Sequence, residues 1–195
     1  MIGCSLILIL LAVLVIAGCK TSRSAYESAP YRVVRTAGQF EVRDYPPLTL
    51  VETSMKGPNP GADGSFNRLF TFITGGNASK QKIAMTTPVF MTSNESNATM
   101  AFVMPQKLNL SEVPQPLDSA VGVRELPPGR FAVLRFQGGR NARNEAAALQ
   151  GLKDWMKTEG LSGLPPPVFA YFDPPWTPGF LRRNEVMLRT GAGKP

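Results

Sequence analysis

The sequence predicts an α+β fold in which two similar halves form antiparallel sheets that close on each other, with two helices outside. Three observations predict this class: strand-like runs recur along the chain, two segments carry apolar residues at helical spacing, and 18 prolines and 18 glycines supply tight turns throughout. With 195 residues, 43% of them hydrophobic, the chain is long enough for one domain with a sizeable core.

Residues 1–18 differ from the rest and predict a lipoprotein signal peptide. No charge precedes Lys20, and an unbroken apolar or small run from Leu6 to Gly18 has the length of a signal h-region. The run ends in Ile-Ala-Gly-Cys, which resembles a bacterial lipobox, so we expect Cys19 to carry lipid such as palmitate. An uncleaved membrane anchor is the alternative, although about 17 apolar residues is at the short limit for a span.

The predicted lipid would hold the protein in a bacterial cell envelope, at the periplasmic face of the outer membrane in a Gram-negative cell. Residues 19–30 lack apolar periodicity and predict a flexible tether from the lipidated cysteine. Residues 31–190 then form the folded domain, with one repeat over about 31–105 and a second over about 121–190, followed by a tail at 191–195.

The first half predicts strands, one helix and a hairpin. The segments YRVVRT, QFEVRDY and LTLVETSMK alternate or carry β-branched residues, as paired antiparallel strands do. The next segment is apolar at the i, i+3, i+4 and i+7 positions of an amphipathic helix, with Asp63 or Ser65 to cap its start and Gly75-Gly76 to stop it. The runs KIAMTTPVFM and TMAFVMP, joined by a polar loop, predict the hairpin.

The second half repeats this order. VGVRELPPGRFAVLRF predicts two strands, Asn141 to Glu159 a helix, and VFAYFD with NEVMLRT two further strands. Val42 to Pro47 resembles Val123 to Pro128, 81 residues later, and we align the last two strands of each half at a spacing of 85 residues. The repeat predicts a core that neither half buries alone and a ligand cleft between the halves.

Composition excludes several classes of function. The chain has no histidine, and its two cysteines are Cys4, inside the predicted leader, and Cys19. Ser-His-Asp triads, Cys-His nucleophiles, histidine-rich metal sites and a histidine-ligated haem are therefore excluded. The net charge of +7 favours an anionic ligand or a membrane surface, but the Lys/Arg blocks of a nucleic-acid-binding arm are missing.

Three motifs occur in order: PYRVVRTAGQFEVRDYPP at the start of the domain, KIAMTTPV in the middle, and DPPWTP followed by FLRRNEV near the end. Together they resemble the SOUL haem-binding family, from about Pro30 to Arg189. The resemblance implies a distorted antiparallel β-barrel of two pseudo-symmetric halves flanked by two α-helices. It also implies non-covalent binding of haem or a related tetrapyrrole.

Because histidine is missing, the implied ligand would be held by apolar packing, with cations at its propionates and at most a methionine, lysine or tyrosine at the iron. The candidate residues are two on the first helix, two methionines in the paired strands, and two aromatics followed by two arginines near the end of the chain: Arg68, Phe72, Met85, Met91, Trp176, Phe180, Arg182 and Arg183. Each has a structural alternative, namely solvent exposure for Arg68, core packing for the methionines, and pairing with Glu185 for the last two arginines.

We expect an envelope lipoprotein that carries or buffers a tetrapyrrole or another amphiphilic small molecule, without catalytic or metal-ligating residues. One alternative is a hydrolase-type enzyme on the same scaffold, with acids or bases drawn from six carboxylates: Glu41, Asp44, Glu52, Glu125, Asp173 and Glu185. Another is a structural or partner-binding envelope protein without a tetrapyrrole. The sequence leaves the oligomeric state open.

Overall fold

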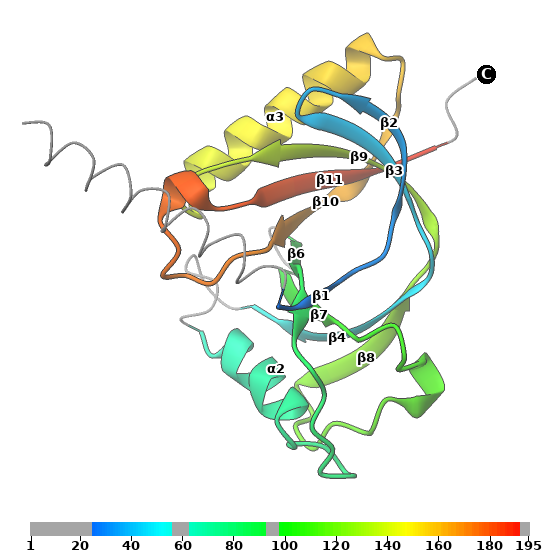
Figure 1. The fold of residues 1–195 in the computed structure, drawn as a ribbon, viewed down its shortest axis with the longest axis vertical. Coiled ribbons are helices and arrows are strands. Elements are labelled where there is room, and N and C mark those ends of the chain that lie inside the picture. The colour runs from blue at the N-terminus through cyan, green and yellow to red at the C-terminus, as the bar shows by residue number, and fades with distance from the viewer. Residues whose placement is uncertain (1–24, 56–62, 93–97, 192–195) are drawn as a thin grey trace, which may run out of the picture.

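The computed structural model describes residues 25–55, 63–92 and 98–191. The predicted leader, the predicted lipidation site Cys19 and most of the predicted tail lie outside these residues. Within them, a large sheet curves around a shared interior, with one helix at each end of the molecule (Figure 1).

Nine strands form one antiparallel sheet, in the order β2-β3-β9-β11-β10-β6-β7-β4-β8. Their bounds are β2 Arg32–Ala37, β3 Phe40–Tyr45, β4 Leu48–Ser54, β6 Val89–Thr92, β7 Thr99–Val103, β8 Val121–Leu126, β9 Gly129–Phe136, β10 Gly163–Tyr171 and β11 Asn184–Thr190. The short strands β1 (Glu27–Ser28) and β5 (Thr86–Thr87) form a separate parallel pair.

The α+β class is as predicted, but the barrel implied by the family resemblance does not close. In the described part of the chain, β2 pairs only with β3 and β8 pairs only with β4, so both remain edges of an open sheet. Closure is not needed to bury the inner face, because side chains from both halves already fill it.

The two halves exchange their first strands. β3 of the first half pairs with β9 of the second, and β8 of the second half pairs with β4 of the first. Tyr45 lies opposite Gly129, and the equivalent Leu126 lies opposite Leu48, in agreement with the 81-residue spacing of the sequence repeat. Each half therefore depends on the other for one strand of its sheet.

The predicted spacing of 85 residues holds for the last strand of each half, β7 and β11, but is wrong for the strand before it. Val89 lies opposite Phe102 and Val168 lies opposite Met187, so β6 and β10 are related by a shorter spacing. The reason is that more residues separate β10 from β11 than separate β6 from β7.

Successive residues of the strands point to opposite faces of the sheet, and three core clusters follow from this alternation. The inner face of both halves carries the shared core: Ala29, Tyr45, Leu48, Leu50, Phe90, Ala101, Val103, Phe131, Val133, Ala170, Phe172 and Met187. The outer face of the first half packs under the first helix, and the outer face of the second half packs under the second.

Two α-helices lie in the described part of the chain, where the sequence predicts them: α2 (Ser65–Ile73) and α3 (Ala142–Thr158). Asn141 caps α3, its side chain accepting from the Asn144 backbone N–H. Neither α2 nor α3 is long and apolar enough to cross a membrane. Two short 3-10 turns, η1 (Leu110–Glu112) and η2 (Gly179–Leu181), complete the described elements.

Candidate ligand-binding site

Helix α2 is buried on one face and leaves the neighbouring face free to line a pocket. Leu69, Phe72 and Ile73 are buried against the outer face of the first half. Asn67 and Thr71, on the adjacent side of the helix, are exposed. The helix folds this way because its apolar residues recur at helical spacing and cover only part of its circumference.

The turn after α2 is tightly packed against the helix. Gly75 has a φ of 117°, a backbone conformation that favours glycine and ends the helix. The Gly76 N–H donates to the Thr71 carbonyl at 2.8 Å, and a Cβ at Gly76 would lie 2.8 Å from that carbonyl oxygen and from the Thr71 methyl carbon. Residue 76 must therefore be glycine for the turn to approach the helix this closely.

The opposite wall of the pocket is the segment 115–121, which the turn holds in place. Asn77 is fully buried and forms an isolated antiparallel bridge with Pro116. The Asp118 carbonyl accepts from the Val121 N–H at 3.0 Å, which closes a turn at the start of β8. Segments far apart in the sequence thus face each other across α2.

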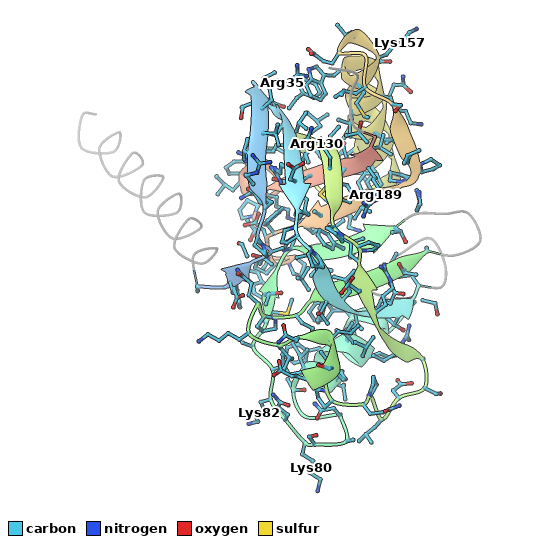
Figure 2. All side chains as sticks on the ribbon, turned by 90° about the vertical axis from the view of Figure 1, so that its right-hand side faces the viewer. Arg35, Lys80, Lys82, Arg130, Lys157 and Arg189 are labelled. Atoms are coloured by element: carbon cyan, nitrogen blue, oxygen red, sulfur yellow. The ribbon has the colours of Figure 1, made fainter. Side chains whose placement is uncertain are left out.

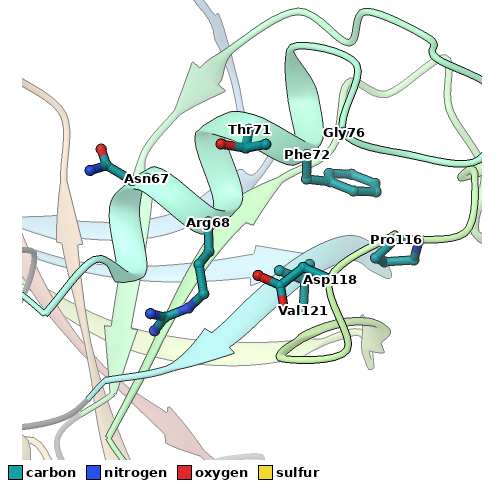
Figure 3. Close-up of a pocket in the computed structure, with 8 residues that line it drawn as sticks. All are labelled: Asn67, Arg68, Thr71, Phe72, Gly76, Pro116, Asp118 and Val121. Atoms are coloured by element: carbon teal, nitrogen blue, oxygen red, sulfur yellow. The ribbon is translucent and has the colours of Figure 1, made fainter.

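Between these walls lies a cavity of about 200 Å³. Figure 3 shows the eight residues that line it: Asn67, Arg68, Thr71, Phe72, Gly76, Pro116, Asp118 and Val121. Phe72 and Val121 are buried, so they supply apolar surface, whereas the side chains of Asn67, Arg68 and Asp118 are polar. The pocket therefore combines an apolar base with polar and charged edges.

Arg68 is the cation of this pocket, and backbone and hydroxyl oxygens hold it in place. Its Nε donates to Thr53 Oγ1 at 3.0 Å, Nη2 to the Ser54 carbonyl at 2.8 Å and Nη1 to the Asp63 carbonyl at 3.2 Å. Because these three acceptors are uncharged, the bonds fix the guanidinium without neutralising it. Asp118 lies across the pocket from Arg68 (Figure 3).

The lining residues suit part of a tetrapyrrole but offer no ligand for its iron. Phe72 and Val121 can contact an apolar ring, and Arg68 can face a carboxylate. None of the eight lining residues is methionine, lysine or tyrosine. The cavity is smaller than the ~300–1,000 Å³ of most ligand pockets, so a macrocycle would seat only an edge in it.

Met85 and Met91 do not line the pocket. Met91 is buried in the core under α2, and the partly buried Met85 packs against the same core. Both positions agree with the core-packing alternative for these residues.

Trp176, Phe180 and Arg182 belong to the long connection from β10 to β11 and do not line the pocket either. Trp176 and Phe180 are exposed. Arg182 donates from Nε to the Thr177 carbonyl at 2.7 Å and from Nη2 to the Pro175 carbonyl. The structure thus places the predicted site residues in two groups, with only Arg68 and Phe72 in the pocket.

Arg183 pairs with Glu185, within a buried network at one end of the shared core. Its Nη2 donates to Glu185 at 2.6 Å, and Arg43 contacts the same carboxylate through Nη1 at 2.7 Å and Nη2 at 3.0 Å. Burial alone would raise the pKa of Glu185, but the hydrogen bond and charge of Arg43, with help from Arg183, hold that pKa below its usual value. Glu185 is therefore ionised and committed to the two arginines.

The other carboxylates that the sequence offers to an enzyme are mostly engaged as well. Glu41 pairs with Arg43 and Arg135, Asp44 with Arg32 and Arg130, and Glu52 with Arg124, while Asp173 accepts from the Arg183 backbone N–H and Glu125 is exposed. The hydrogen bond from Arg130 is the main cause of the lowered pKa of Asp44. Over the described residues, no three acidic or cysteine side chains gather as a metal site would require.

A second, shallower hollow of about 480 Å³ lies where β3, β9, β10 and β11 meet at one end of the sheet. Arg130 and Arg189 border it and lie close together in Figure 2. Arg130 is paired with Asp44, and Arg189 donates to the carbonyls of Pro127 and Pro128 at 2.6 and 2.9 Å. No residue predicted from the sequence to bind the ligand lines this hollow.

The predicted cleft between the two halves is wrong, because the shared core fills that space with side chains from both. The pocket lies instead on the outside of the first half. Sequence reasoning found Arg68 and Phe72 from their helical spacing but missed the segment 115–121. That segment carries no periodic pattern, and only its contact with the turn after α2 makes it part of a site.

Comparison with known proteins places the chain among haem-binding relatives. Residues 26–189 match the family model described as SOUL heme-binding protein. Human "Heme-binding protein 2" is 28% identical over 134 residues, which cover 63% of this chain and 64% of the human protein. The match therefore spans slightly less than two thirds of the relative's length.

Solved structures share the fold at low sequence identity. An uncharacterized conserved protein from Listeria innocua has a TM-score of 0.61 at 13% identity, covering 78% of this chain and 92% of its own. A hydrolase from Listeria innocua has a TM-score of 0.58 at 12% identity, covering 81% and 94%. The EcmrR C-terminal domain has a TM-score of 0.58 at 11% identity, covering 83% and 98%. At these identities the likeness concerns the fold alone.

Proposed function

Because the chain belongs to the SOUL heme-binding protein family, we propose that it binds haem or a related tetrapyrrole non-covalently at the pocket beside α2. The observation that carries this location is that Arg68 and Phe72, both singled out by their place on the helix, line one pocket with an apolar base. Arg68 would face a propionate, while Phe72 and Val121 would contact the ring.

Binding of this kind depends on packing and charge, not on coordination of iron. The pocket lining offers an arginine and apolar carbon but no side chain that commonly ligates haem iron. We therefore expect metal-free protoporphyrin to bind about as tightly as haemin. The protein would carry or buffer its ligand, because an open pocket of this size lets a planar ligand leave as well as enter.

Titration of purified protein with haemin and with metal-free protoporphyrin tests this proposal. Saturable changes in the Soret band, with dissociation constants within about tenfold of each other, a free-energy difference of about 1.4 kcal/mol, are the expected result. The absence of a saturable change at micromolar protein with either ligand would reject tetrapyrrole binding. Tight binding of haemin alone would instead require an iron ligand outside the pocket.

A pair of tryptophan substitutions tests the location. Thr71→Trp places a large ring into the pocket from an exposed position, and we expect it to weaken binding at least about tenfold. Phe70→Trp introduces the same residue on the other side of α2, away from the pocket, and should leave binding unchanged. Equal effects of the two substitutions would place the ligand elsewhere.

We also propose that the protein is anchored in the bacterial envelope by lipid on Cys19. The lipobox-like sequence Ile-Ala-Gly-Cys supports this proposal. Replacing Cys19 with serine should release the protein from the membrane fraction, as followed by fractionation and mass spectrometry. Continued membrane retention of that variant without an acyl group would indicate an uncleaved anchor.

We propose a binding protein and not an enzyme. Five of the six candidate carboxylates accept from arginine side chains or a backbone N–H, and such engagement leaves little freedom for proton transfer. Turnover of an ester or glycoside substrate that disappears in Glu125→Gln, the variant of the remaining carboxylate, would favour the hydrolase alternative.

A further inference from the structure

The connection between β10 and β11 displays two large aromatic side chains on the surface. Trp176 is 81% exposed and Phe180 is 71% exposed. Trp is mostly buried in folded proteins, so such exposure of two aromatics four residues apart is unusual. Neither residue lines the pocket beside α2, and the proposed tetrapyrrole site therefore leaves this surface unexplained.

The exposure does not arise from a loosely held loop. Thr177, between the two aromatics, is buried, and its carbonyl accepts from Arg182 Nε at 2.7 Å. The Leu181 N–H donates to the Pro178 carbonyl at 2.9 Å, forming the turn η2 that carries Phe180. The loop is thus tied to itself on both sides of the aromatics and holds them outward.

The loop is also fixed to the start of α3. The Gly138 N–H donates to the Gly179 carbonyl at 3.0 Å, and a Cβ at Gly179 would lie 3.3 Å from the Gly139 nitrogen. Figure 1 shows η2, in orange, beside the beginning of α3. We call this surface, formed by residues 138–145 and 173–183, the aromatic surface.

The aromatic surface carries an excess of positive charge. Its two segments contain four arginines, Arg140, Arg143, Arg182 and Arg183, and two acidic residues. Arg143 is exposed, and the side-chain hydrogen bonds of Arg182 go to uncharged carbonyl oxygens. Exposed aromatics beside arginines are the combination that binds the interface of a bilayer with anionic lipids.

The N-terminal part of the domain meets the base of the same loop. Arg183 Nη2 donates to the Tyr31 hydroxyl at 3.3 Å, and Ala29 shares the inner core with Phe172. The described chain begins at Ala25, six residues after Cys19, and six residues span at most about 20 Å. Lipid on Cys19, which is itself only proposed, would therefore hold this side of the domain near the membrane.

We propose that the aromatic surface docks onto a lipid bilayer, with Trp176 and Phe180 inserted among the headgroups and the surrounding arginines facing anionic lipids. The loop itself supplies this affinity, so the proposal does not depend on tetrapyrrole binding or on lipidation. Docking would fix which side of the domain faces the membrane and would leave the separate pocket beside α2 accessible.

The test uses a chain that begins at Lys20, which lacks the leader and Cys19 but keeps every described strand, helix and core residue. The protein has two tryptophans, so Trp155→Phe leaves Trp176 as the sole fluorophore. Far-UV circular dichroism confirms that this variant is folded. Wild-type protein in a vesicle sedimentation assay provides a second measurement that does not depend on the substitution.

We expect Trp176 emission to shift to shorter wavelength with mixed phosphatidylglycerol and phosphatidylcholine vesicles, and less with phosphatidylcholine alone or at high salt. In the sedimentation assay, the double variant Trp176→Ser with Phe180→Ser should bind the anionic vesicles at least about tenfold more weakly. Leu117→Ser, which removes an equally exposed apolar side chain elsewhere, should bind them like the wild type.

The proposal is overturned if neither emission nor sedimentation responds to anionic vesicles, or if the double variant binds them like the wild type. It is also overturned if the double variant loses haemin binding while keeping vesicle binding, because the loop would then be a tetrapyrrole surface. Unchanged haemin binding in the double variant, together with lost vesicle binding, is the expected result. Failure of haemin to bind any variant would reject the tetrapyrrole proposal and leave the bilayer proposal standing.

Discussion

At the scale of residues, the most consequential feature is the buried charge network at one end of the shared core. Arg43 and Glu185 are both completely buried, and the Arg43 guanidinium also donates from Nε to Glu41 at 2.6 Å and stacks over the Tyr31 ring at 4.1 Å. A buried arginine and carboxylate are tolerated only when each is paired and hydrogen-bonded. The network therefore makes Glu185 a structural residue.

Removing the charge of Glu185 should be strongly destabilising. Glu185→Gln leaves Arg43 and part of Arg183 without a counter-charge, so we expect the free energy of unfolding at neutral pH to fall by about 3–5 kcal/mol. Urea denaturation followed by circular dichroism measures this change. Glu125→Gln, an exposed carboxylate in β8, is the control and should change stability by less than about 0.5 kcal/mol. A loss below about 1 kcal/mol for Glu185→Gln would contradict a structural role.

The same residue predicts a pH dependence. The pKa of Glu185 is lower in the folded protein than its ordinary value of 4.5, so its contribution is fully present above that pH. The contribution is lost as the pH falls through the lower, folded-state pKa. Urea midpoints of the wild type should therefore decline below about pH 4.5, and the decline should be shallower in Glu185→Gln. Parallel declines in both proteins would assign acid sensitivity to other carboxylates.

At the scale of elements, the two helices are held in different ways. α3 begins at a side-chain cap, with Asn141 Oδ1 accepting from the Asn144 N–H at 2.9 Å. α2 begins at Gly64, which has no side chain to cap with, although Asp63 Oδ1 accepts from the Ser65 N–H at 3.1 Å. The shorter helix α2 therefore depends more on its packing against the sheet, as expected for a helix of 9 residues.

The cap of α3 can be tested with one pair of substitutions. Asn141→Ala removes the acceptor and should lower the free energy of unfolding by about 1 kcal/mol. Asn141→Asp keeps an acceptor at the same position and should be close to the wild type. Urea denaturation compares the three proteins, and equal losses in both variants would show that the side-chain oxygen is not the stabilising group.

At the scale of the whole molecule, the exchange of β3 and β8 joins the halves into one folding unit. Without the first half, β9 loses its partner β3, and the inner face of the second half loses the side chains that cover it. Each half also has too little apolar surface of its own to offset the entropy of folding. The domain should therefore behave as a single cooperative unit.

Two measurements test this cooperativity. Far-UV circular dichroism and fluorescence of the intact domain should give coincident unfolding transitions. A fragment spanning residues 115–191 should lack a cooperative transition, although it contains α3 and its four strands. Cooperative unfolding of that fragment alone would show that the exchanged strand β3 is dispensable for the second half.

The sequence by itself determined the class of fold, the positions of both helices and the repeat, because each depends on local periodicity, turn residues or spacing along the chain. It also determined that histidine and thiol-pair chemistry are excluded, since those residues are missing from the folded part. The placement of Arg68 and Phe72 side by side on one helix follows from helical spacing alone.

Only the tertiary structure decided the rest. It filled the space between the halves, left the sheet open, and placed the pocket on the outside of the first half, where α2 meets a loop some forty residues later in the chain. It also separated Trp176 and Phe180 from that pocket and committed Arg183 to Glu185. These features depend on contacts between segments far apart in the sequence, and local patterns carry no information about such contacts.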